Sequence, residues 1–112
     1  MGFAAEYLES EPARSEVDAL KGPVLIEFGA PWCGYCMAVQ ASLADMLARF
    51  PDVTHIKVHD ARRRPLGRSF RVKLWPNLVF LRDGKVVAQL ARPGNDQILA
   101  GLTAIAVDQS TT

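Results

Sequence analysis

The sequence predicts a single α/β domain, and three patterns carry that prediction. A mostly apolar, strand-favouring run over residues 24–30 is followed by an amphipathic pattern over residues 34–50. An alternating run follows at residues 53–60, and residues 77–92 read as two strands joined at Asp83-Gly84. Strand–helix–strand order predicts parallel pairing with a right-handed crossover, and the hairpin adds antiparallel strands. A chain of 112 residues has enough material for one core only.

The first half of the chain can be read in order. Residues 1–14 form an N-terminal segment that is expected to fray or to add an edge strand. Residues 15–22 predict a short helix that Ser15 caps and that Gly22-Pro23 stops. The strand at residues 24–30 should be buried on both faces because it hardly alternates. The helix over residues 34–50 is ended by Pro51.

The second half alternates strands with helical segments. In the strand at residues 53–60, Ile56 and Val58 face away from His55, Lys57 and His59, and we expect the two histidines to be partly solvated. Residues 62–73 form a basic, partly helical connector before the hairpin. A last helix begins at residue 95 with Asn95 or Asp96 as its cap. The domain should therefore extend over residues 15–106, with a tail at 107–112.

Composition excludes two classes of function. Thirteen basic and twelve acidic residues leave a formal charge of +1, which gives no reason to expect nucleic-acid binding. The apolar runs are shorter than the roughly 20 residues that a membrane span needs.

The first residues lack the pattern of a secretory signal, so we expect a cytoplasmic protein. A reducing compartment disfavours a purely structural disulfide.

Cys33 and Cys36 are the only cysteines, and they could belong to a metal site, a structural staple or a redox pair. Together with His55 and His59 they imitate a zinc site, but residues 37–54 make a gap of 18 residues, longer than that pattern uses. On a strand, two histidines four residues apart are separated by about 13 Å. Zinc ligands must approach the metal to roughly 2 Å. We therefore expect no metal.

A redox pair fits the local structure better. The unpaired N–H groups and the dipole at a helix N-terminus stabilise a thiolate, which is the nucleophile in disulfide exchange. Cys33 falls immediately before the helix, and Cys36 lies one turn inside it and should be more buried. Cys33 is therefore expected to attack and Cys36 to resolve the mixed disulfide. Gly34 allows the tight turn between them.

Two stretches resemble the thioredoxin superfamily. "VLIEFGAPWCGYC" resembles the strand, loop and helix that carry W-C-G-x-C in that family, and "LWPNLVFLRDGKVV" resembles its cis-proline loop and hairpin. The resemblance covers about residues 15–106 and implies a thioredoxin fold, with a central mixed sheet flanked by helices on both faces. It also implies a monomeric thiol–disulfide oxidoreductase without a bound cofactor. Such a protein acts on disulfide-containing client proteins and is reduced by a reductase or another electron donor.

The resemblance also assigns roles to particular residues. Trp32 would pack beside the nucleophile, and Pro76 would carry a cis peptide bond facing the sulfurs. Trp75 would offer its backbone N–H and C=O to an extended substrate. Glu27, which is costly to bury, matches an acid that passes a proton to and from the buried cysteine. Lys57 matches a lysine that the family places near that acid. The alternative is that Glu27 and Lys57 form only a structural ion pair.

Some positions depart from the thioredoxin pattern. Tyr35 replaces the proline of Gly-Pro and restores a backbone N–H, which can stabilise the Cys33 thiolate and make the disulfide a stronger oxidant. The bulky Trp75 would narrow the substrate groove, and Arg92 would add a positive charge to it. The alternative function is therefore a thioredoxin-fold binding module or maturation chaperone in which redox activity is secondary. The basic segment at 62–73 is either a solvated face or a surface that selects an acidic client.

Overall fold

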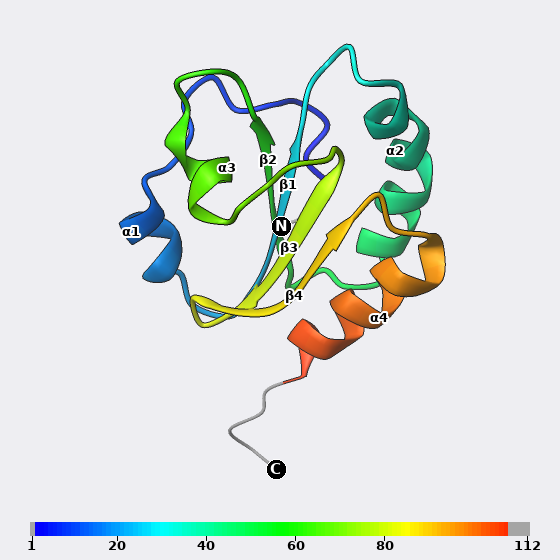
Figure 1. The fold of residues 1–112 in the computed structure, drawn as a ribbon. Helices are drawn as coiled ribbons and strands as arrows, with labels where there is room; N and C mark the ends of the chain where they lie inside the picture. Colours follow the sequence, from blue (N-terminus) through cyan, green and yellow to red (C-terminus); the bar gives the residue numbers. More distant parts are fainter. Residues whose placement is uncertain (1, 108–112) are drawn as a thin grey trace.

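The structure is a computed structural model that describes residues 2–107. Its centre is a four-stranded sheet with the order β2-β1-β3-β4 (Figure 1). The strands are β1 (Pro23–Gly29), β2 (Thr54–His59), β3 (Asn77–Arg82) and β4 (Lys85–Ala91). β1 pairs in parallel with β2 and antiparallel with β3, and β3 pairs antiparallel with β4. The predicted mixed sheet is confirmed.

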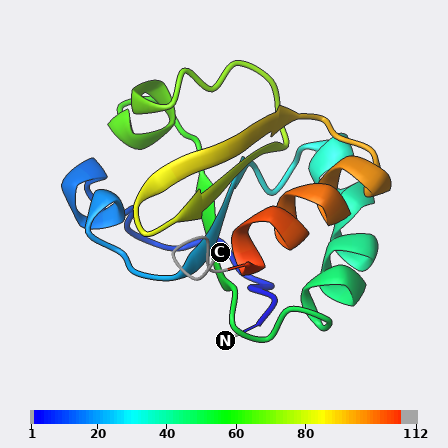
Figure 2. The same ribbon diagram turned by 90° about the horizontal axis from the view of Figure 1, so that it is seen from below.

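Helices cover both faces of this sheet. They are α1 (Arg14–Asp18), α2 (Gly34–Leu47), α3 (Pro65–Ser69) and α4 (Asn95–Ala106). α2 and α4 lie on one face, and α1 and α3 lie on the other, as both views show (Figures 1 and 2). Each pair closes its own apolar core against the sheet. The three-layer arrangement predicted from the sequence is therefore confirmed.

The central strand β1 is buried from Val24 to Gly29, as its lack of alternation predicted. Leu25 packs in the core under α2 and α4, whereas Ile26 and Phe28 pack in the core under α1 and α3. Because side chains alternate along a strand, Glu27 shares the face of Leu25 and lies on the side of α2.

The helix ends differ from the prediction. α1 begins after Ala13 rather than after Ser15, and the Glu16 carboxylate accepts the Ala13 N–H at 3.0 Å. α4 begins after Gly94 rather than after Asn95 or Asp96, and Gln97 Oε1 accepts the Gly94 N–H at 2.9 Å. In both helices a side chain of the first turn accepts the N–H of the N-cap residue, which is one half of a capping box.

α2 ends at Leu47, before the end that Pro51 predicted. The N–H groups of Arg49 and Phe50 donate to the carbonyl groups three residues earlier, on Met46 and Leu47. The last turn is therefore tighter than an α-helix.

The N-terminal segment runs along β2 without forming a strand. Leu8 N–H donates to the Lys57 carbonyl oxygen at 2.9 Å, and Ala4 N–H donates to His55 Nδ1 at 2.8 Å. Lys57 Nζ in turn donates to the Ala5 carbonyl oxygen at 2.9 Å. The segment is thus neither the edge strand nor the loose end that the sequence allowed. Of the tail at 107–112, all but Val107 lies outside the described residues.

Within residues 2–107, no helix is both long and apolar enough to cross a membrane.

Gly101 of α4 packs against the ring of Phe80, where an added Cβ would lie 2.7 Å from the nearest ring carbons. Alanine normally stabilises a helix by about 1 kcal/mol over glycine, but overpacking a core costs about 1–3 kcal/mol. We expect Gly101→Ala to lower the free energy of unfolding by about 1 kcal/mol in urea denaturation. In a Phe80→Leu background the same change should be neutral or stabilising. A stabilised Gly101→Ala single variant would contradict this packing argument.

Candidate active site

The two cysteines meet where β1 leads into α2. Cys33 is the N-cap residue of α2, and its Sγ accepts the Cys36 N–H at 3.2 Å. The Cys36 thiol donates to Cys33 Sγ, with 2.6 Å between the sulfurs, and both cysteines are free. Cys33 is partly exposed, whereas Cys36 is buried with 1% of its surface accessible. The predicted difference in burial is confirmed.

The backbone N–H that reaches the Cys33 sulfur belongs to Cys36, not to Tyr35. The sequence-based argument that Tyr35 supplies this donor is therefore wrong. A proline at position 35 would leave the observed bond intact. A different residue, Gly29, allows α2 to lie close to β1, because a Cβ at position 29 would lie 2.6 Å from Cys36 Sγ.

Cys36 has an environment that keeps its thiol protonated. Burial, the hydrogen bond to Cys33 and the negative charges of Cys33 and Glu27 raise the pKa of Cys36 to about 12, although a backbone hydrogen bond involving Ala30 opposes the shift. The Tyr7 hydroxyl lies beside the Cys36 sulfur, since a Cβ added at Gly29 would stand 3.1 Å from the one and 2.6 Å from the other. Burial, followed by the charges of Cys36 and Glu27, raises the pKa of Tyr7, so its hydroxyl remains a donor. No local sequence signal pointed to Tyr7.

Glu27 is fully buried and both of its carboxylate oxygens have partners. Oε1 lies 2.9 Å from His55 Nε2, and Oε2 accepts Gln40 Nε2 at 2.8 Å. Because the Ala4 N–H donates to His55 Nδ1, the ring carries a proton on Nε2, which it donates to Glu27. His55 is therefore a buried partner of Glu27, and the expectation of a partly solvated histidine was wrong. Its face of β2 is covered by the N-terminal segment.

Lys57 lies opposite Glu27 in the parallel register but does not bind it directly. Lys57 Nζ donates to Gln40 Oε1 at 2.8 Å, and Gln40 Nε2 also donates to the Cys36 carbonyl oxygen at 2.8 Å. Gln40 thus joins Lys57, Glu27 and Cys36, and the proposed direct ion pair is replaced by this bridge. The sequence reading missed Gln40, although it lies four residues after Cys36 on the same helix face.

Trp32 and His59 meet beside the dithiol. The rings of Trp32 and His59 are 4.9 Å apart and nearly perpendicular, and the Tyr7 ring lies 6.0 Å from His59 on the other side. Trp32 is 69% exposed, so it is a surface side chain rather than a core one. Its indole is available to an approaching protein.

The loop before β3 has the backbone that the resemblance implied, because the Trp75–Pro76 peptide bond is cis. The Trp75 indole Nε1 donates to Asp60 Oδ2 at 2.9 Å. The Trp75 carbonyl oxygen, which was expected to be open to substrate, accepts Arg92 Nε at 2.7 Å. That acceptor is occupied by the protein's own side chain.

Arg92 connects the two loops of the site. Its backbone N–H donates to the Pro76 carbonyl oxygen at 2.8 Å, and its guanidinium lies 4.1 Å from the centre of the Tyr35 ring. Its φ angle of 49° lies in the left-handed region that favours glycine. Arg92 therefore lies beside the cis-proline loop, and its role at a substrate groove stays a prediction.

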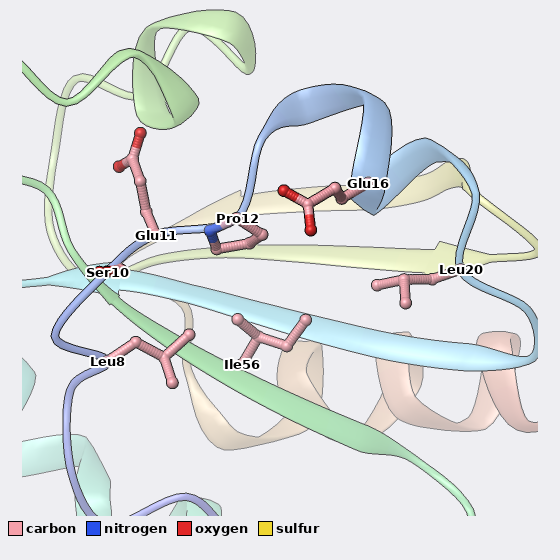
Figure 3. A pocket seen from close by; sticks show the side chains of 7 residues that line it. All are labelled: Leu8, Ser10, Glu11, Pro12, Glu16, Leu20 and Ile56. Atoms are coloured by element: carbon pink, nitrogen blue, oxygen red, sulfur yellow. The ribbon is translucent and has the colours of Figure 1, made fainter.

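Two hollows border these residues, and another lies elsewhere on the surface. One of about 220 Å³ reaches Cys36 between Tyr7, Gln40 and Lys57. A second, of about 510 Å³, lies beside Trp32 and Trp75. A third lies apart from the dithiol, where Leu8 and Ile56 face Leu20 and Glu16 (Figure 3). None of the residues predicted for the site lines the third hollow.

The fold and the dithiol define the class: a CXXC pair at the start of a helix, beside a cis-proline loop, is the arrangement of thioredoxin-fold thiol–disulfide oxidoreductases. A family model described as Thioredoxin matches residues 5–104, so the chain belongs to the thioredoxin family. The function predicted from the sequence is confirmed at the level of this class.

Individual proteins that are similar to this chain are also thioredoxins. The reduced structure of thioredoxin 2 from Pseudomonas aeruginosa PAO1 has a TM-score of 0.82 and 47% identity, covering 93% of this chain and 97% of that one. A Thioredoxin H-type of Ricinus communis is 28% identical over 78 residues, or 70% of this chain and 66% of that protein. A Thioredoxin H-type of Picea mariana is 27% identical over 89 residues, which are 80% of this chain and 71% of that protein. The chain spans about two thirds of the length of these plant relatives.

The raised pKa of Cys36 predicts selective alkylation. An ordinary thiol has a pKa of about 8.5, so a pKa of about 12 leaves Cys36 almost wholly protonated at about pH 8. We expect iodoacetamide to modify the reduced, folded protein once, at Cys33. Modification of Cys36 should increase as the pH rises toward 12. Peptide mass spectrometry locates the label, and in urea both cysteines should react. Equal labelling of both cysteines in the folded protein would refute this.

Proposed function

We propose that this chain reduces disulfides of client proteins with its own dithiol. The observation that carries the proposal is a partly exposed Cys33 sulfur that accepts two hydrogen bonds from Cys36. The Cys33 thiolate attacks one client sulfur, which breaks the client disulfide and forms a mixed disulfide. The released client thiolate takes a proton from solvent.

Cys36 completes the reaction. It loses its proton and attacks Cys33 Sγ, forming the Cys33–Cys36 disulfide and releasing the second client sulfur as a thiolate, which takes a proton from solvent. Two electrons pass from the dithiol to the client. The high pKa of Cys36 delays this step until the proton has an acceptor.

Glu27 is the proposed acceptor of that proton. Its negative charge acts on Cys36, and Gln40 binds both Glu27 Oε2 and the Cys36 carbonyl oxygen. Lys57 would hold Gln40 in place, and the Tyr7 hydroxyl would stabilise the Cys36 thiolate by donating to it. Lys57 and Tyr7 are positioning residues in this scheme.

Clients are proposed to dock across the two loops of the site. Trp32, Tyr35 and Gly34 line the nucleophile on one side, and Trp75 with Pro76 lines it on the other. The Trp75 N–H remains a donor for an extended client segment, whereas its carbonyl oxygen becomes available only when Arg92 moves. Arg92 is therefore proposed to influence which clients bind.

An external reductase or another dithiol donor must restore the reduced pair, because no bound cofactor is part of this proposal. We propose a cytoplasmic, monomeric protein. Cys33 and Cys36 are the only cysteines, so a reducing compartment removes no structural disulfide.

Serine substitutions separate the two chemical steps. Cys36→Ser should accumulate a mixed disulfide with a synthetic disulfide-linked peptide, because nothing remains to attack Cys33 Sγ. Cys33→Ser should form no adduct, because the remaining thiol is buried and protonated. Intact-protein mass spectrometry under non-reducing conditions detects the adduct. An adduct on Cys33→Ser, or none on Cys36→Ser, would reverse the assigned roles.

The double variant Cys33→Ser/Cys36→Ser tests the second candidate, a binding module or maturation chaperone. The bulky Trp75 and the charged Arg92, which are joined by a hydrogen bond beside the cis-proline, motivate this candidate. Client binding that persists without either thiol would support it, and loss of binding would count against it.

Glu27→Gln tests the proton acceptor. The charge of Glu27 helps to raise the pKa of Cys36, so its removal alone would lower that pKa and speed resolution at neutral pH. Loss of the acceptor instead slows resolution, and we expect about a hundredfold slowing. Rapid-quench measurement of mixed-disulfide decay reports this step, while the first attack by Cys33 should keep its rate. Faster decay would show that Glu27 supplies only charge.

A further inference from the structure

Four arginines lie beside the two tryptophans of the site. Arg92 meets the main chain of Trp75, as described above. Three others, Arg62, Arg64 and Arg68, line the hollow of about 510 Å³ with Trp32 and Trp75. Sequence reasoning left open whether this basic segment is only a solvated face. Its position beside the dithiol favours a role in client binding.

Within residues 2–107, these four arginines form no ion pair with a carboxylate. The ion pairs among residues 2–107 join Arg14 to Asp18, His55 to Glu27 and Arg82 to Asp83, and they include none of the four arginines. Arg64 donates to the carbonyl oxygens of Glu9 and His59, which leaves its charge uncompensated. Asp60 also lines the hollow, where its carboxylate accepts the Trp75 indole N–H and offsets one of the three positive charges, so the hollow stays net positive.

Exposed apolar side chains accompany these charges. Trp32 is 69% exposed, Tyr35 62%, Met37 59% and Leu74 49%, and all four belong to or adjoin the two loops of the site. Aromatic residues, methionine and arginine are the residues enriched in protein interfaces. The surface therefore combines an apolar contact area with a positive rim.

Arg92 gives this surface a specific anion-binding group. Its φ angle of 49° lies in the left-handed region, where glycine would be less strained. Nε is bound to the Trp75 carbonyl oxygen, and Tyr35 holds the guanidinium plane. The terminal nitrogens donate to no acceptor in the described part of the chain, so they remain available to a carboxylate.

We propose that this surface, the arginine rim formed by Arg62, Arg64, Arg68 and Arg92, selects client segments that carry acidic residues on both sides of the reactive disulfide. An extended segment over Trp75 can bring one carboxylate to Arg92 and another to the arginines around the hollow. The rim also attracts such segments before contact, because uncompensated surface charge increases the association rate. The inference rests on the proposed reductase function and names its substrate class.

The test compares three disulfide-linked peptides that differ only beside the cysteine, with glutamate, glutamine or lysine. We expect the reduced protein to reduce the glutamate peptide about tenfold faster than the lysine peptide at low ionic strength, measured as a second-order rate constant. High ionic strength should reduce this ratio toward one.

Substitutions then place the preference on the rim. Arg62→Gln/Arg68→Gln/Arg92→Gln should abolish the preference, and Arg64 is left intact because it holds the Glu9 and His59 backbone. The matched control is Lys21→Gln/Arg49→Gln/Lys85→Gln, which removes the same net charge from exposed positions near the start of β1, the end of α2 and the start of β4. The control should keep the preference.

Equal rates for the three peptides, or a preference that the rim variant retains, would overturn the inference while leaving the reductase function intact. Failure to reduce any peptide would instead overturn the reductase function. In that case the reduced peptides are titrated against Cys33→Ser/Cys36→Ser. The inference then survives only if this variant binds the glutamate peptide more tightly than the glutamine peptide.

Discussion

The buried carboxylate of Glu27 is the constraint on which the site depends. A charge without solvent access is stable only when hydrogen-bonded partners replace the lost water. Those partners are His55 on β2 and Gln40 on α2, and the N-terminal segment completes the network by binding His55 and Lys57. One buried group thus holds together the strand, the helix and the segment that surround Cys36.

The same arrangement gives the two sulfurs different surroundings. Cys36 lies inward, above the Glu27 network and against Tyr7, where burial keeps its proton in place. Cys33 lies outward, next to the exposed Trp32 and close in sequence to Tyr35, whose ring the Arg92 guanidinium covers. The two sides of the dithiol therefore differ: buried polar groups surround Cys36, and exposed aromatic side chains adjoin Cys33.

Much of the fold and the centre of the site could be predicted from the sequence. The unbroken apolar run of β1, the Asp83-Gly84 turn and the cysteine spacing are local patterns, and each reports a local geometry. The cis peptide bond before Pro76 followed from the family resemblance rather than from such a pattern. The expectation for His55 was wrong because alternation along a strand shows which residues share a face, but not what covers that face.

By itself, the sequence determined the α/β order, the pair Cys33–Cys36 at a helix start, and the placing of Glu27 in a buried strand. Tertiary structure alone decided the partners: Ala4 with His55, Gln40 between Lys57 and Glu27, Tyr7 with Cys36, and Arg92 with Trp75. The physical reason is that periodicity and helix-end effects act over a few residues. A buried polar group, by contrast, takes whichever donor the fold brings near it, often from a distant part of the chain.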